Sequence, residues 1–166
     1  WRLPRRCTLL AYIAFFVPTS SPGGDGASAV LVCTDKYAAA SSWDVLAKIK
    51  GIAVAGCQPE IMGYGPVVST IKALERSGLG MADIDLIELN EAFAVQALAC
   101  VRELSFDLDK MNLDGGAIAL GHPLGATGAR ITGKAAQLLQ REGKQYALAT
   151  QCIGGGQGIS TVLEAA

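Results

Sequence analysis

The sequence predicts an α/β protein in which helices pack on the faces of a mixed, mostly parallel sheet of five strands. Three observations support this layered α-β-α fold class. Apolar runs with strand-like and helical spacing alternate along the 166 residues, which is typical of such folds. Hydrophobic residues make up 51% of the chain, enough for the core of one domain. Glycine is frequent, and eleven of the 20 glycines lie between Gly115 and Gly158.

Five segments have the apolar or β-branched pattern of strands. They are residues 27–33, 45–55, 84–89, 146–151 and 159–163. The first is a short apolar run between turn-forming residues, which predicts a buried strand. A glycine-rich turn separates the last two, which predicts an antiparallel hairpin.

Four segments have helical spacing, namely residues 36–42, 67–77, 92–104 and 126–141. The segment 67–77 stops at Gly78, a common helix terminator. The segment 92–104 is apolar on nearly all sides, so we expect that helix to be mostly buried. Between the elements lie a loop over residues 56–66 and a long glycine-rich loop over residues 115–128.

Composition excludes several classes of protein. The chain has 14 basic and 15 acidic residues, so it lacks the basic excess that binds a nucleic-acid backbone. It has five cysteines in no CxxC pair and a single histidine, which excludes a zinc ribbon or finger. An odd number of cysteines without regular spacing argues against a disulfide framework and favours an intracellular, reducing compartment.

The first residues differ in character from the rest. Residues 2–17 combine a basic start with an apolar run, which is typical of a signal peptide but too short to span a bilayer. They could instead be a buried piece of a larger domain or the product of a misread exon boundary. The possible cleavage site at residues 27–29 lies within a strand-like run, which argues against an export signal. We expect no membrane association. We treat residues 1–18 as a divergent segment and residues 19–166 as the domain.

One glycine motif has the spacing of a phosphate-binding loop. Residues 128–134 fit G-x-x-x-x-G-K, but Ala135 stands where a serine or threonine should ligate magnesium. The run also lies inside a helical pattern. Nucleotide binding is therefore disfavoured.

Three polar residues are candidates for chemistry. His122 lies between Gly121 and Pro123 and could exchange a proton near neutral pH, although a lone histidine is often structural. Cys152 ends a predicted strand before three glycines. It could be a nucleophile or an acid/base group beside backbone amides that hold an oxyanion, or simply a small residue before a tight turn.

Asn90 follows a predicted strand and precedes a helix. It could cap that helix, or position a water or carbonyl group at the carboxyl edge of the sheet. Asn90 and Cys152 both end strands, and His122 lies on the loop between them. The sequence therefore predicts a site at that edge.

Three motifs together resemble the thiolase family of acetyl-CoA C-acyltransferases. They are Asn90-Glu91-Ala92-Phe93-Ala94, the glycine-rich residues 115–130 and Cys152-Ile153-Gly154-Gly155-Gly156-Gln157-Gly158. The likeness runs from about Ser21 to Glu164. It covers only the C-terminal half of such an enzyme, so residues 19–166 resemble a thiolase C-terminal domain.

The resemblance implies a role for each matching residue. His122 resembles the histidine that activates the nucleophilic cysteine, and Asn90 the asparagine that holds a water in the first oxyanion hole. Cys152 resembles the acid/base cysteine, and the amide of Gly154 resembles half of the second oxyanion hole. Four further residues match positions around the acyl group and the pantetheine arm, namely Ser21, Met62, Ala92 and Phe93. The sequence around Ser21 departs from the family pattern.

The resemblance also implies an activity and partners. Thiolases transfer an acyl group between 3-ketoacyl-CoA and CoA, by thiolysis as in fatty acid β-oxidation or by Claisen condensation. The substrate is a coenzyme A thioester, with no metal or other cofactor. The expected partners are the thiolase N-terminal half and further copies, as a dimer or tetramer. The family has mitochondrial, peroxisomal and cytoplasmic members.

The family's nucleophilic cysteine belongs to the N-terminal half, and the surroundings of Cys7 do not match it. We therefore expect this chain to be inactive alone. The alternative is a non-catalytic thiolase-fold fragment that acts as a binding or assembly module.

Overall fold

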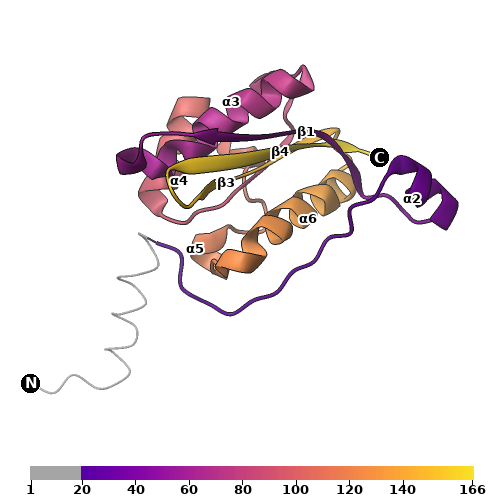
Figure 1. Cartoon of the computed structure of the whole chain (residues 1–166), viewed down its shortest axis with the longest axis horizontal. Coiled ribbons are helices and arrows are strands. Elements are labelled where there is room, and N and C mark those ends of the chain that lie inside the picture. Colours follow the sequence, from indigo (N-terminus) through magenta and orange to yellow (C-terminus); the bar gives the residue numbers. More distant parts are fainter. Residues whose placement is uncertain (1–19) are drawn as a thin grey trace, which may run out of the picture.

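The computed structural model describes residues 20–166, which form a central sheet with helices on both faces (Figure 1). The sheet has the strand order β1-β4-β3-β2. Its strands are β1 (Ala47–Gly56), β2 (Leu86–Leu89), β3 (Tyr146–Ile153) and β4 (Gln157–Ala165). β4 pairs antiparallel with both β1 and β3, whereas β2 runs parallel to β3. The α/β class and the predicted closing hairpin are confirmed.

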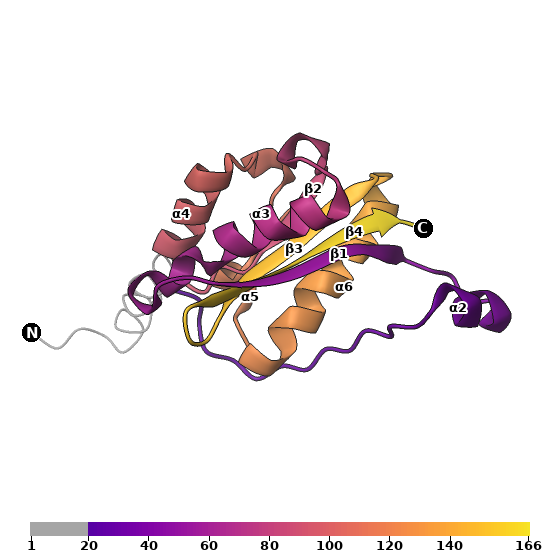
Figure 2. The same cartoon turned by 45° about the horizontal axis from the view of Figure 1, so that its top comes forward.

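The helices are α2 (Asp35–Ser41), α3 (Gly65–Ser77), α4 (Ala94–Leu104), α5 (Ala117–Leu120) and α6 (Leu124–Glu142). Three short 3-10 turns are η1 (Pro59–Tyr64), η2 (Met81–Asp83) and η3 (Leu108–Lys110). α3 and α4 lie on one side of the sheet and α6 lies on the other (Figure 2). The four predicted helices are therefore present within a few residues. The loop before α3 contains η1, and the glycine-rich loop contains α5.

Each face of the sheet has its own apolar core. Leu148 of β3 packs with Val67 and Leu74 of α3. The neighbouring residue Ala147 packs on the opposite side with Ile131 and Leu138 of α6. This division follows from the strand geometry, since successive side chains point to opposite faces.

The fifth predicted strand, residues 27–33, does not form. This segment is extended and exposed, and it runs past α6 towards α2 (Figure 1). Its Leu31 is 72% exposed. Within residues 20–166 it pairs with no strand, and an apolar run needs a neighbouring strand for its backbone hydrogen bonds. The sheet consequently has four strands, with parallel pairing only between β2 and β3.

Helix α4 is less buried than its apolar sequence predicts. Only Gln96, Ala97 and Cys100 are buried, whereas Val95 is 75% exposed and Leu98 is 53% exposed. The helix contacts η1 and α3 on one side only, so its other side faces outward. The expectation of a mostly buried helix was wrong for that reason.

A buried cluster of hydroxyl groups ties α3 to the hairpin. Ser160 Oγ on β4 lies 2.7 Å from Ser69 Oγ, 2.9 Å from Thr70 Oγ1 and 2.7 Å from Thr150 Oγ1. All four residues have no exposed surface. Buried hydroxyls are costly unless they are hydrogen-bonded, so this cluster fixes the hairpin against α3.

The predictions for residues 1–18, including the signal-like pattern, lie outside the described residues. In the part of the chain that the structure describes, every helix is too short or too polar to cross a membrane.

Candidate active site

A pocket of about 510 Å³ opens where β3 ends and the loop before α6 meets η1. Seven of the eight predicted site residues line it, namely Ser21, Met62, Ala92, Phe93, His122, Cys152 and Gly154. The eighth, Asn90, lies directly behind His122. The structure therefore brings the whole predicted set together.

Asn90 is held at the end of β2. It is fully buried, and its backbone N–H donates to the carbonyl oxygen of Thr150 over 2.9 Å. Its side-chain Nδ2 lies 3.4 Å from Nε2 of His122. Its Oδ1 is buried and accepts no hydrogen bond from the described residues. Asn90 thus faces the site rather than acting as a helix cap, because α4 begins only at Ala94.

His122 is fixed by the backbone conformation before it and by hydrogen bonds from both its backbone and its ring. Gly121 has a φ of 99°, a conformation that favours glycine. The N–H of His122 donates to the carbonyl oxygen of Pro22 over 3.2 Å. Its ring nitrogen Nδ1 lies 2.7 Å from Oγ1 of Thr127, which donates its own hydrogen to the carbonyl oxygen of Pro123 over 3.1 Å.

These contacts assign the tautomer of His122. Because the hydroxyl of Thr127 gives its hydrogen to Pro123, it can only accept from His122, which places the proton on Nδ1. Nε2 is then an acceptor, in agreement with the neighbouring amide group of Asn90, whose Nδ2 can only donate. Nε2, the nitrogen on the Asn90 side of the ring, is therefore the one without a proton.

The pKa of His122 is lowered from its ordinary value. The main cause is burial, and the positive charge of Arg130 adds to it. Both disfavour the imidazolium form. His122 is therefore neutral at pH 7 and able to accept a proton.

Cys152 lies near the end of β3, opposite Gly158 of β4. It is half-buried. Burial, and to a smaller extent the nearby thiol of Cys57, raises the pKa of Cys152. The thiol therefore stays protonated at neutral pH, as a proton donor must. Gly154 is exposed, begins the turn after β3 and lines the pocket.

The remaining predicted residues form the rim. Ser21 donates from both its backbone N–H (3.1 Å) and its Oγ (3.2 Å) to the carbonyl oxygen of Ala92. Met62 on η1 is 37% exposed and Phe93 is 43% exposed. An apolar rim with few polar groups is typical of a pocket for an organic ligand.

Sequence reasoning missed Thr127 and Glu91 as parts of the site. Glu91 accepts hydrogen bonds from Nδ2 of Asn112 and from the N–H of Ile118 at the start of α5, both over 3.0 Å. It thereby holds the turn that leads to His122. Two features of the sequence could have indicated them. Thr127 carries a hydroxyl five residues after His122, and Glu91 is a carboxylate directly after Asn90.

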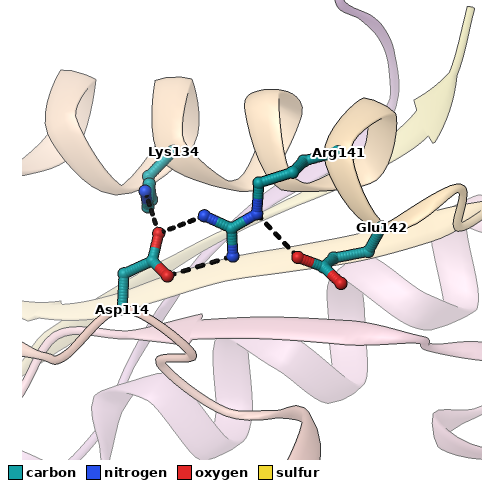
Figure 3. Close-up of polar contacts among 4 residues, drawn as sticks. All are labelled: Asp114, Lys134, Arg141 and Glu142. Atoms are coloured by element: carbon teal, nitrogen blue, oxygen red, sulfur yellow. Dashed lines mark hydrogen bonds and ion pairs between the residues drawn. The ribbon is translucent and has the colours of Figure 1, made fainter.

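The phosphate-loop spacing at residues 128–134 has a structural explanation. The run lies inside α6, and Lys134 pairs with Asp114, which also receives two hydrogen bonds from Arg141 over 2.6 and 3.0 Å (Figure 3). Nε of Arg141 in turn donates to Glu142 over 2.6 Å. Lys134 is thus part of an ion-pair network that holds α6 to the preceding loop. Within residues 20–166 no three His, Cys, Asp or Glu side chains form a cluster that could hold a metal ion.

Comparison with known proteins decides the family. Residues 43–165 match the model for the C-terminal domain of thiolase. The chain belongs to the thiolase family. It is 55% identical over 149 residues to a 3-ketoacyl-CoA thiolase of Vibrio cholerae, covering 88% of this chain and 38% of that thiolase. A 3-ketoacyl-CoA thiolase of Shewanella loihica is 57% identical over 151 residues, or 89% of this chain and 39% of the relative.

Solved thiolase structures share the fold. Human mitochondrial 3-ketoacyl-CoA thiolase in complex with CoA superposes with a TM-score of 0.88 at 46% identity, over 90% of this chain and 38% of that one. Bacillus anthracis acetyl-CoA acetyltransferase gives a TM-score of 0.78 at 43% identity, over 80% and 34%. The chain thus spans less than two fifths of the length of these thiolases.

Proposed function

We propose that this chain supplies the C-terminal half of a thiolase active site, which transfers an acyl group between 3-ketoacyl-CoA and CoA. The observation that carries the proposal is the single pocket that His122, Cys152 and Gly154 share, with Asn90 at the back of His122. A neutral imidazole, a protonated thiol and a free amide are the groups that this reaction needs at one place.

His122 is the proposed base for the first step. Its Nε2 accepts the proton of a nucleophilic cysteine, whose thiolate then attacks the C3 carbonyl of the substrate. The resulting imidazolium and a water held by the amide group of Asn90 stabilise the oxyanion. A lowered pKa keeps His122 unprotonated until that step.

Cys152 is the proposed acid for carbon–carbon bond cleavage. As the bond between C2 and C3 breaks, the electron pair stays on C2 as the enolate of acetyl-CoA. The thiol of Cys152 protonates C2, while the amide of Gly154 stabilises the thioester oxygen. CoA then gives its thiol proton to the thiolate of Cys152 and attacks the acyl-cysteine. The shortened acyl-CoA leaves, and His122 returns its proton to the nucleophilic cysteine. In condensation the same groups work in reverse.

The nucleophile of this scheme lies outside the chain, so we infer that the chain is inactive alone. A partner segment that carries this cysteine would cover an exposed apolar face. Ile52 and Val54 of β1 are each 43% exposed beside α6, and Val32 is 67% exposed in the extended segment next to it. Exposed apolar surfaces of this kind mark association sites. Assembly into a dimer or tetramer, the absence of a cofactor and the cellular compartment remain predictions.

The second candidate is a non-catalytic thiolase-fold module that only binds partners. The same apolar face favours association without deciding between the two functions. The pocket favours catalysis, because a module that only binds needs no neutral histidine and protonated thiol at one site.

The test is a hybrid enzyme. The matching C-terminal part of the Vibrio cholerae 3-ketoacyl-CoA thiolase is replaced with residues 20–166 of this chain, and thiolysis of acetoacetyl-CoA is measured. We expect thiolysis by the hybrid and none by the isolated chain. The matched variants His122→Ala and Lys48→Ala should respectively abolish and retain activity. A folded hybrid without thiolysis would favour the binding module.

A further inference from the structure

A buried carboxylate lies behind the site and is not used in the proposed mechanism. Glu88 on β2 is 1% exposed, and its Oε1 has no hydrogen-bond partner among the described residues. Two residues earlier on the same face of β2, Leu86 packs with Ile131 and Ala135 of α6. The alternation of strand side chains therefore directs Glu88 towards α6.

Arg130 on α6 is half-buried and carries the opposite charge. Its Nε and Nη2 atoms are buried and have no hydrogen-bond partner in residues 20–166. These two nitrogens form the edge of the guanidinium that binds a carboxylate with two parallel hydrogen bonds. Unpartnered buried groups are costly, and here two of opposite charge lie on elements that pack together.

Two charges on α6 and two on loops act on Glu88. Burial raises its pKa to about 7, Arg130 and Lys134 of α6 lower it, and Asp114 and Glu91 raise it. Lys134 already pairs with Asp114. Arg130 is therefore the cation of α6 that is available to Glu88.

The positive charge of Arg130 also acts on His122. Its charge contributes to the lowered pKa of His122. It follows Thr127 by about one turn of α6, and Thr127 contacts Nδ1 of His122. Glu88 precedes Asn90 by two residues, and Asn90 contacts Nε2. Glu88 and Arg130 thus stand on the two elements that hold the two nitrogens of the imidazole ring.

We propose that Glu88, when it ionises, turns to pair with the free edge of Arg130 and so joins β2 to α6. Both are positioning residues, because the elements that they join lead to Asn90 and carry Thr127, the two contacts of the His122 ring. The inference rests on the proposed role of His122, but its test requires no acyl transfer, so the two can fail separately.

The test uses the only histidine of the chain, whose ring protons give an unambiguous NMR titration of His122. Arg130→Met should raise the midpoint of His122, because a neighbouring positive charge is removed. The side-chain carboxyl ¹³C signal of Glu88 gives the pKa of that group, which Arg130→Met should raise above about 7, because the cation that lowers it is removed. Lys48→Met is the control, because it removes an exposed positive charge on β1 that contributes to the pKa of neither Glu88 nor His122, and it should leave both midpoints unchanged.

One result would overturn the proposal, namely a pKa of Glu88 that Arg130→Met leaves unchanged or lowers. A second measurement needs no substitution and covers the case in which a variant fails to fold. In the unaltered chain, the Nε–H signal of Arg130 should be protected from solvent exchange above pH 7 and lose protection below it. The exposed Arg76 is the reference, and equal exchange of the two signals at high pH would contradict the pair.

Discussion

Nδ1 of His122 lies 2.7 Å from Oγ1 of Thr127, whose hydroxyl is committed to the carbonyl oxygen of Pro123. This relationship leaves Nε2 unprotonated. Thr127 stands on the first turns of α6, so the start of that helix selects the protonation state of a loop residue. A serine or threonine can do this because its hydroxyl both donates and accepts.

Thr127→Val should therefore change the tautomer of His122. Valine keeps the shape of the side chain but cannot accept a hydrogen bond, so the preference for a proton on Nδ1 is lost. The ¹⁵N chemical shifts of the two ring nitrogens report the tautomer directly. Thr127→Ser is the control and should keep the unaltered pattern. An unchanged tautomer in the valine variant would contradict the assignment.

His122 should titrate below its ordinary value of 6.5. Because protonation is easier in the unfolded chain, the free energy of unfolding should fall as the pH drops through 6.5. The NMR midpoint of His122 is the measurement. A midpoint at or above 6.5 would show that burial and Arg130 do not act as described.

Glu88 should make the opposite contribution. Its pKa rises from 4.5 to about 7 in the folded chain, so its ionisation opposes folding. The free energy of unfolding should decrease as the pH rises from about 4.5 to 7, by up to about 3 kcal/mol from this group. Urea unfolding of Glu88→Gln at several pH values should show a flatter profile than the unaltered chain. Parallel profiles would contradict the raised pKa.

The same glycine-to-alanine change should have opposite effects at two positions. Gly121 has a φ of 99°, so Gly121→Ala should destabilise the chain by about 1–3 kcal/mol and disturb His122. Gly125 lies in α6 with open space around it, so Gly125→Ala should stabilise the chain by up to about 1 kcal/mol. Thermal unfolding gives both values. A neutral Gly121→Ala would mean that the turn before His122 is not constrained.

Ser160→Ala should cost about 1–3 kcal/mol, because it removes the common hydrogen-bond partner of three buried hydroxyls. Ser41→Ala at the end of α2 is the control and should change stability by less than about 0.5 kcal/mol. Urea unfolding of both variants tests this. Equal stabilities would show that the buried cluster contributes nothing.

The sequence was sufficient to predict the elements and site residues that depend on local patterns and motifs. The apolar runs on either side of Gly154–Gly156 predicted the hairpin, and the motifs predicted which residues line the pocket. It failed for residues 27–33 because strand formation depends on a neighbouring strand, which a local pattern does not report. It missed Thr127 because the contact of Thr127 with His122 depends on how the start of α6 lies against the loop before it. It also gave no sign that Glu88 and part of Arg130 are buried, because their burial depends on how α6 packs against β2.

The central claim is that His122 activates the nucleophilic cysteine and that Cys152 exchanges a proton with C2 of the acetyl group. Deuterium exchange tests this claim most directly. In the hybrid thiolase, acetyl-CoA should exchange the protons of its acetyl methyl group with D₂O. Cys152→Ala should slow this exchange by about 100-fold or more while acylation of the nucleophilic cysteine by acetyl-CoA continues. His122→Ala should instead abolish acylation. Undiminished exchange in a folded Cys152→Ala hybrid would contradict the account.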